Sequence, residues 1–274
     1  MTAAEKARFR TYFPALDVNQ AVVTDGPTAV YNCIAWTVGI TTRWIWPGRA
    51  LANFDTFYKG FGLIRSGDGP VATWGHSTTH MTHGSVSGAG HGPRWESKCG
   101  GDLRIQHGLG ELVGSMYGRV LAFYRRARTV SAANEAVAEE IMTEKTAKSY
   151  LSATQRKALA DVRARVPADL RAAYDRAFAA WKATWFRGGL AIDSDPHGRA
   201  VGPEYDALIA LGPAIIPLVV ESLAEPENFF ALQLYDAIQP NDQLLVQFEP
   251  DDERILEGEQ GRARRVVQAW FANR

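Results

Sequence analysis

The stretch "TAVYNCIAWTVG", residues 28–39, holds Cys33, one of only two cysteines in the 274-residue chain. Its residues predict a short helix that begins at the cysteine, because the side chain of Asn32 is a good N-cap and Gly39 is typical of a helix end. The start of a helix favours a thiolate, since free N–H groups and the helix dipole lower the pKa of a cysteine there. We therefore interpret Cys33 as a candidate nucleophile; the alternative is a buried cysteine that packs as a small apolar residue.

The overall composition excludes several classes of protein. The chain balances 30 Lys and Arg against 30 Asp and Glu and has no basic run, so a nucleic-acid partner is not expected. No stretch approaches the roughly 18 consecutive apolar residues of a membrane span. The opening MTAAEKARFR lacks the apolar core of a secretory signal, which predicts a cytoplasmic protein or one exported by a signal-independent route. In the cytoplasm Cys33 and Cys99 are expected to be free thiols.

The composition and hydrophobic spacing of the sequence change near residue 131, where long Ala-, Glu-, Arg- and Leu-rich segments begin. This change predicts an α+β domain over 1–130 and an all-helical domain over 131–274. We expect the boundary at 128–132, because Ser131 can cap a helix and acidic residues follow it. The first part is rich in Gly, Trp, His and Thr and contains short β-prone runs. Strands are expected at 70–76, 80–86, 93–99 and 119–126.

The second part has the spacing of amphipathic helices. Helices are expected over 152–166 and 167–186, with Trp181 and Trp185 on the stripe that faces the core. Gly-Pro and Glu-Pro breaks separate three shorter helices, expected over 204–212, 213–225 and 228–239. These resemble a HEAT-like helix pair, with about one and a half repeats visible. The helical half is therefore expected either to cover the first domain or to serve as a docking surface for a protein partner.

Five of the six histidines fall within residues 76–107, in the same half as Cys33. A cysteine hydrolase needs a histidine base that is distant in sequence and near in space. His83 lies in the small-residue frame "MTHGS" within an expected strand, whereas His80 lies where that strand begins. We therefore predict His83 as the base.

The order of these elements resembles the NlpC/P60-type papain-like cysteine hydrolases. The match rests on Cys33 at a helix start, on "MTHGS" in the second of three successive strands, and on "PRWESKC" as the next one. The resemblance implies a papain-like α+β fold with a small antiparallel sheet and a cysteine-bearing helix. It also implies Cys33 as nucleophile, His83 as base, and a polar third residue from the neighbouring strand. Over residues 1–126 the chain also looks similar to a group of bacterial proteins with an N-C-I-A-W element.

The third member of the catalytic group has two candidates, Glu96 and His107. A carboxylate at Glu96 could hold the imidazole tautomer and stabilise its cation, although NlpC/P60 enzymes usually carry His, Asn or Gln in this role. His107, in "LRIQH", could reach the same sheet edge from the last strand. The residues that flank the cysteine are the candidate oxyanion and substrate contacts, namely Tyr31, Asn32 and Trp36.

These observations predict a cysteine hydrolase that acts on an amide or peptide bond with no metal or cofactor. The NlpC/P60 resemblance implies a cell-wall-type peptide as substrate, and a protein substrate is the alternative. If an amine enters in place of water, the same site would act as a transglutaminase or transpeptidase. Deamidase-type acyl transfer, in which water attacks the acyl group of a side-chain amide, is a further alternative at this site. Two other functions are kept as alternatives. One is a non-catalytic binding module that works through the helical half. The other is a zinc site, for which the available ligands are His76, His80 and His83 with Cys99 or His107.

Overall fold

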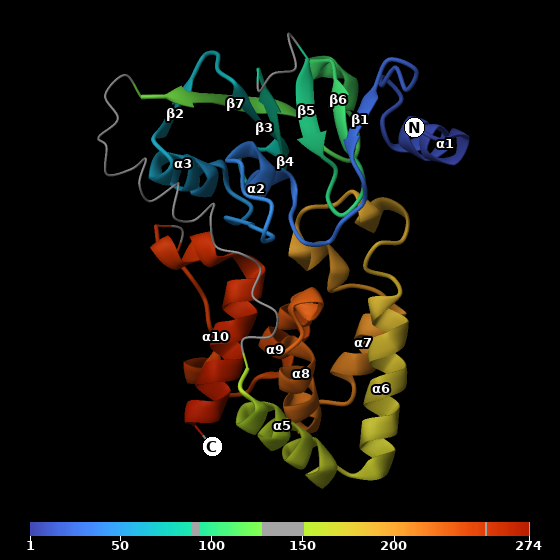
Figure 1. Cartoon of the computed structure of the whole chain (residues 1–274), viewed down its shortest axis with the longest axis vertical. Helices are drawn as coiled ribbons and strands as arrows, with labels where there is room; N and C mark the ends of the chain where they lie inside the picture. The colour runs from blue at the N-terminus through green and yellow to red at the C-terminus, as the bar shows by residue number, and fades with distance from the viewer. Residues whose placement is uncertain (89–93, 128–150, 250, 274) are drawn as a thin grey trace. The chain divides into compact units, whose positions relative to one another are not determined.

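The computed structural model describes residues 1–88, 94–127, 151–249 and 251–273, and these form two compact units (Figure 1). The first unit runs from the N-terminus to residue 127 and takes in two later pieces, Ala191–Asp195 and Glu249–Leu256. The second unit comprises the other described residues from 151 onward. The expected boundary at 128–132 and the helix expected from Ser131 lie outside the described residues. Each unit is considered by itself below.

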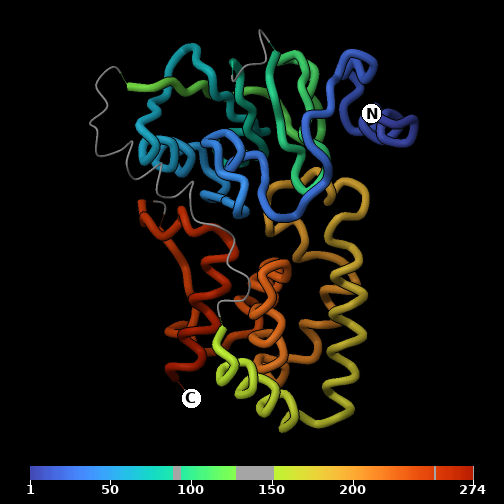
Figure 2. The backbone as a smooth tube through the Cα atoms, viewed as in Figure 1, coloured from blue at the N-terminus to red at the C-terminus, as the bar shows by residue number. Residues whose placement is uncertain are grey.

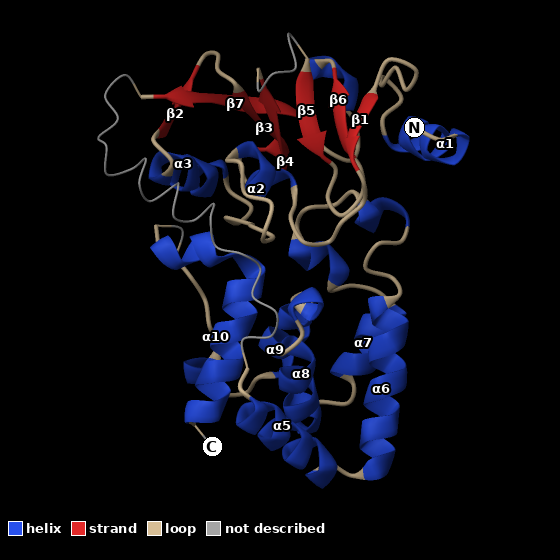
Figure 3. Cartoon of the chain, viewed as in Figure 1, coloured by secondary structure: helices blue, strands red, loops and turns tan. Residues whose placement is uncertain are grey.

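The first unit is built on a seven-stranded sheet with the order β1-β6-β5-β4-β3-β7-β2, shown in red in Figure 3. Every neighbouring pair is antiparallel. The strands are β1 (Val22–Asp25), β2 (Leu63–Ser66), β3 (Val71–Ser77), β4 (His80–Ser87), β5 (Trp95–Lys98), β6 (Arg104–His107) and β7 (Arg119–Arg126).

Two helices cover one face of this sheet, α2 (Cys33–Thr37) and α3 (Leu51–Gly60). Their apolar side chains form a core with those of the strands, and Cys33 belongs to this core. The helix α2 lies close to β4 because Gly84 has no side chain there. A Cβ atom at Gly84 would lie 3.0 Å from Ile34 Cδ1 and 3.1 Å from Thr37 Cγ2, which is tighter than ordinary packing.

The opposite face carries a second core, to which α1 (Ala3–Tyr12) contributes Phe9. Thr2 and Glu5 begin α1 with a reciprocal capping box, which satisfies two backbone N–H groups at its start. Trp74 of β3 and Tyr117 are fully buried in this second core.

A bulge in the pairing of β3 with β4 decides which residues face each core. Trp74 lies opposite His83, but the next residue, Gly75, lies opposite Met81. One residue of β4 is therefore extra, and the simple alternation of the strand is lost at this point. Met81 packs in the core with Cys33, whereas the ring of His83 lies against Trp74 and the ring of Tyr117 on the other face.

The second unit is helical over its described residues, and Figure 3 shows no strand there. Trp181 and Trp185 are buried and pack edge to face, with their ring centroids 5.0 Å apart. The helices are α5 (Ala153–Arg165), α6 (Ala168–Lys182), α7 (Pro203–Ile209), α8 (Ile216–Leu223), α9 (Ala231–Ile238) and α10 (Gly258–Ala272). None of these described helices is, by itself, long and apolar enough to cross a membrane; Pro203–Ile209 and Pro213–Leu223 qualify only as a pair that is bent by 88°.

The expected mixed α+β fold is confirmed, with an antiparallel sheet and additional helices. The strand expected at 119–126 coincides with β7, and those expected at 70–76 and 80–86 match β3 and β4 within a residue. The five helices expected in the second half correspond to α5 through α9. Both thiols are free, as expected.

Gly84 provides a test of the packing between α2 and β4. We expect Gly84→Ala to lower the free energy of unfolding by about 2 kcal/mol, because the new methyl group must push α2 away from the sheet. Gly67→Ala is the matched control, since a Cβ there meets nothing within 4 Å. Denaturant unfolding would measure both, and equal effects would contradict the assigned packing.

Candidate functional site

Cys33 is the first residue of α2, and the cap predicted for it is present. The Asn32 side-chain oxygen accepts a hydrogen bond from the backbone N–H of Ala35 at 3.2 Å, and its amide donates to the carbonyl of Ile45 at 2.8 Å. Cys33 is fully buried, and this burial raises the pKa of its thiol to about 12. The backbone N–H groups of Gly84 and Ile34 act in the opposite direction, but burial dominates.

A segment from much later in the chain, Ala191–Asp195, belongs to the same unit as Cys33 and contains the hydrogen-bond partner of its thiol. Figure 2 colours the backbone by residue number, from blue at the N-terminus to red at the C-terminus. Cys33 Sγ lies 3.0 Å from Ser194 Oγ, its hydrogen-bond partner, and both residues are fully buried. The carbonyl of Ser194 accepts a hydrogen bond from Trp44 Nε1 at 2.9 Å. The cysteine therefore faces a residue whose peptide carbonyl is already bound by a side-chain donor.

His83, the predicted base, has different surroundings. Its ring stacks on that of Tyr117, with centroids 3.8 Å apart and planes 4° from parallel. Neither ring nitrogen has a hydrogen-bond partner among the described residues, so the predicted hydrogen bond to Cys33 is not formed. Complete burial, aided by the nearby His107, holds the pKa of His83 well below its usual value. The ring is neutral at physiological pH, and it faces away from α2.

His107 ends a buried chain of hydrogen bonds on the same face as His83. Its Nδ1 lies 2.8 Å from the carbonyl oxygen of Gly108, which can only accept, so Nδ1 carries the proton and Nε2 is an acceptor. Ser97 Oγ then donates to Nε2 at 2.8 Å, Ser85 donates to Ser97, and Trp74 Nε1 donates to Ser85. Burial lowers the pKa of His107 to about 4, which keeps the ring neutral, and the Gly108 carbonyl fixes which nitrogen carries the proton.

Glu96, the other candidate for the third role, lies on the opposite face of the sheet from His107. Its carboxylate is 1% exposed and lies 3.1 Å from Arg104 Nε, while the Thr24 hydroxyl also donates to it. Of the two candidates, His107 is the one that contributes to the lowered pKa of His83, because protonation of both rings would place two cations close together. Neither residue hydrogen-bonds to His83.

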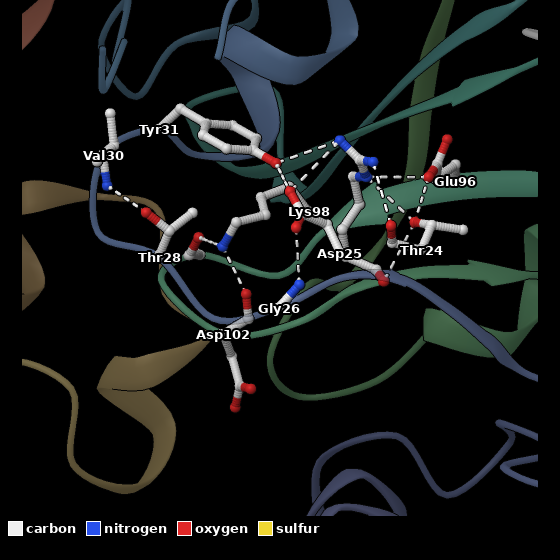
Figure 4. Close-up of polar contacts among 11 residues, drawn as sticks. Thr24, Asp25, Gly26, Thr28, Val30, Tyr31, Glu96, Lys98 and Asp102 are labelled. Carbon is white, nitrogen blue, oxygen red and sulfur yellow. Dashed lines mark hydrogen bonds and ion pairs between the residues drawn. The ribbon is translucent and has the colours of Figure 1, made fainter. Parts of the chain in front are cut away.

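The residues beside Cys33 belong to a polar cluster between β1, β5 and β6, defined by Thr24, Asp25, Tyr31, Glu96, Lys98 and Arg104 (Figure 4). Tyr31 donates its hydroxyl to Asp25 at 2.8 Å and accepts from Arg104 at 3.2 Å. Burial raises the pKa of Tyr31 to about 12, with the hydrogen bond to Asp25 adding to it. Trp36 stacks against the Arg104 guanidinium, 4.0 Å from its ring centroid. Tyr31 and Trp36 thus anchor the chain on both sides of the cysteine.

Lys98 is a buried residue of this cluster that the sequence analysis did not select. Its ammonium group donates to the carbonyls of Gly100, at 2.7 Å, and Asp102. Burial lowers the pKa of Lys98 to about 8, and its charge in turn acts on the thiol of Cys33. The signal in the sequence was the alternation in "WESK", which places Lys98 on the same face as Glu96.

The histidines of the zinc alternative do not converge. His76 and His80 are exposed, with ring centroids 5.1 Å apart, whereas His83 is buried. Within the part of the chain that the structure describes, no three His, Cys, Asp or Glu residues are grouped so as to hold a metal ion. His91 lies outside the described residues.

The ion pair of Arg104 and Glu96 stabilises the polar cluster, and its contribution can be tested by substitution. We expect Arg104→Met to lower the free energy of unfolding by about 3 kcal/mol, because Glu96 would remain buried without its cation. In Arg125→Met, the matched control, the lost pair is 3.8 Å apart and both partners are mostly exposed, so the cost should stay within about 0.5 kcal/mol. Thermal or denaturant unfolding of both variants would test the difference.

The buried histidines make stability depend on pH. The unfolded chain takes up protons near pH 6.5, whereas folded His107 does so only near pH 4, so acid favours unfolding. Between pH 7 and pH 5 this residue alone should lower the free energy of unfolding by about 2 kcal/mol. His107→Gln should remove that part of the pH dependence, whereas His76→Gln, at an exposed site, should leave it unchanged. Identical pH profiles for the two variants would contradict a neutral, buried His107.

The comparisons with known proteins concern the first unit. Residues 22–125, from the start of β1 to the penultimate residue of β7, match a family described as a domain of unknown function (DUF7689). No curated protein matches the chain. No solved structure matches it either. The family match covers the sheet, α2 and all the candidate site residues predicted from the sequence.

Proposed function

We propose that the first unit is a cysteine-dependent hydrolase of amide or peptide bonds, with Cys33 as the nucleophile. One observation carries the proposal: Cys33 Sγ faces a peptide residue, Ser194, whose carbonyl is held by a side-chain N–H donor, that of Trp44. Acyl transfer requires a nucleophile and a fixed donor to the carbonyl oxygen, and these two groups meet at one residue here: the Cys33 thiol at the Ser194 hydroxyl and the Trp44 N–H at the Ser194 carbonyl. In the conformation described here the thiol is protonated and forms a hydrogen bond with the hydroxyl of Ser194.

The papain-like assignment is part of the proposal. It is supported by a cysteine-bearing helix, α2, that packs on an antiparallel sheet at β4, the strand on which the histidine was predicted. It is opposed by the orientation of His83, which points to the other face. The NlpC/P60 resemblance therefore accounts for the place of the cysteine better than for the place of its base.

We propose Lys98 as a second candidate for the proton acceptor, although its ammonium group donates to the carbonyls of Gly100 and Asp102 and not to the thiol. Its lowered pKa, about 8, gives a fraction of neutral amine near neutral pH, and it is the buried cation whose charge acts on the thiol of Cys33. His83 remains the acceptor predicted from the resemblance.

The proposed reaction has two steps. In the first, the sulfur of Cys33 forms a bond to the substrate carbonyl carbon as the base takes the thiol proton. The C–N bond then breaks, and the amine leaves with that proton, which gives a thioester. In the second step water adds to the thioester, the C–S bond breaks, and the acid and the free thiol are released. An amine in place of water would give the transglutaminase-type product, and a side-chain amide as substrate would give deamidation.

For the second unit we propose HEAT-like character and a role in docking a protein. The support is the succession of three short helices, α7, α8 and α9. Gly202-Pro203 precedes α7, and Gly212-Pro213 precedes the turn that leads into α8. The pairs α8 with α9 and α7 with α9 are in contact, as stacked helices of a repeat would be.

The nucleophile is tested by acylation with p-nitrophenyl acetate. Because Cys33 is fully buried, we expect slow release of one equivalent of nitrophenol as the site transiently opens, an acetyl thioester on the peptide that contains Cys33, and still slower turnover afterwards. Cys33→Ala should reduce the acylation rate about a thousandfold or more. Cys99→Ala is the matched control, because Cys99 is equally buried and its pKa is also raised to about 12. Acylation that survives in Cys33→Ala would overturn the proposal.

The acceptor is identified by the same assay over a range of pH. With Lys98 as the acceptor, the acylation rate should rise through about pH 8, Lys98→Met should lose this rise, and His83→Asn should keep it. The reverse pattern would assign the proton to His83.

A further inference from the structure

The segment Ala191–Asp195 is held as a bound peptide is held, through its backbone. Three of its carbonyl groups accept hydrogen bonds from the rest of the first unit. The donors are the backbone N–H of Gly101 to Ala191 O at 2.8 Å, the Tyr117 hydroxyl to Ile192 O at 2.8 Å, and Trp44 Nε1 to Ser194 O at 2.9 Å. Hydrogen bonds to the peptide backbone do not depend on the peptide's side chains, so they give affinity for many sequences. Pockets for individual side chains then determine which sequences bind.

Three side chains of the segment have distinct surroundings. Ile192 is fully buried in the second core, beside Cys99 and Tyr117. Ser194 is fully buried at Cys33 Sγ. The carboxylate of Asp195 lies 2.6 Å from Nε of Arg49, a side chain that is 53% exposed. The apolar Ile192 therefore lies in the second core, the small Ser194 lies at the thiol, and the acidic Asp195 pairs with a partly exposed arginine.

The surface beneath the segment is shaped for close approach of a backbone. Gly100 has a φ of +51°, and a Cβ there would lie 2.6 Å from the carbonyl carbon of Ile192 and 2.8 Å from the carbonyl oxygens of Ala191 and Asp193. Any side chain at this position would collide with the segment. The residues that precede and follow the segment, Leu190 and Pro196, belong to the second unit, so it is an insertion into the first.

We propose that Ala191–Asp195 occupies the substrate site of Cys33 as a pseudosubstrate, and that the site takes peptides with the pattern apolar, any residue, small, acidic. The inference rests on the proposed function, because it names the substrate class of the same site. The substrate carbonyl that corresponds to that of Ser194 is then the one attacked, and Trp44 Nε1 donates to its oxygen. While the chain's own segment is in place, the buried thiol cannot meet a substrate.

The first experiment compares the alkylation rates of Cys33 and Cys99 by iodoacetamide in the full-length chain. In the wild type both thiols should react slowly, since both are fully buried. Gly100→Ala places a methyl group against the segment and should speed the alkylation of Cys33 relative to Cys99 by about tenfold or more. Gly88→Ala is the control: it imposes the same kind of backbone strain, with a φ of +82°, but a Cβ there meets nothing within 4 Å.

A second pair of variants tests the same proposal in case Gly100→Ala does not fold. Trp44→Phe and Trp74→Phe each remove an indole N–H that donates a hydrogen bond of 2.9 Å inside the unit, but only Trp44 holds the segment. Trp44→Phe should therefore raise the ratio of Cys33 to Cys99 alkylation about fivefold, and Trp74→Phe should leave it unchanged. An unchanged ratio in both Trp44→Phe and Gly100→Ala would overturn the proposal and leave the segment as ordinary core structure.

The substrate pattern is tested with the synthetic peptide GGLAIDSDPHG, residues 188–198, added to Gly100→Ala or Trp44→Phe. The peptide should slow the alkylation of Cys33 in the opened variant, and a peptide with Asp in place of Ile at the apolar position should not. Equal protection by both peptides would overturn the assigned pattern. Alkylation and protection need no turnover, so they report on the pseudosubstrate alone. Selective protection together with failed acylation of Cys33 would retain a peptide-binding site and refute the hydrolase.

Discussion

The close contact of α2 with β4 is the constraint on which the rest of the first unit depends. Because Gly84 has no side chain, the helix can settle on the strand, and Cys33 at its first position is driven into the core. Asn32 then joins the helix start to the chain at Ile45, so the cysteine cannot move without disturbing both. Packing of this kind positions the thiol and also buries it, which keeps it protonated.

The sheet separates two buried polar systems that the sequence had joined in one catalytic group. On the α2 side, Glu96 and Lys98 share a cluster with Arg104 beside the cysteine. On the other side, His83 and His107 are neutral, and His107 closes a chain of hydrogen bonds that runs from Trp74. Buried polar groups of this sort persist when each is satisfied. Among the described residues, neither ring nitrogen of His83 has a hydrogen-bond partner, so this side chain departs from that rule.

The segment Ala191–Asp195 contributes to the burial of the Cys33 thiol in the first unit. Its carbonyls accept hydrogen bonds from Gly101, Tyr117 and Trp44, the donors that we propose an incoming peptide would use. A site that binds its own chain in this way competes with any external peptide, since both need the same donors. The candidate nucleophile and its proposed inhibitor are thus parts of one arrangement of hydrogen bonds.

Local sequence determined the start of α2 at Cys33 under its Asn32 cap, the extent of β7, and the helices around Trp181, because caps and hydrophobic periodicity act over a few residues. Only the tertiary structure decided which groups meet. Strict alternation would put Met81 and His83 on one face, but a bulge set by pairing with β3 puts them on opposite faces. Ser194 reaches Cys33 across 161 residues, and no local pattern encodes that contact. Such long-range partners depend on the packing of the whole unit, where burial and close approach select among geometries that the local sequence leaves open.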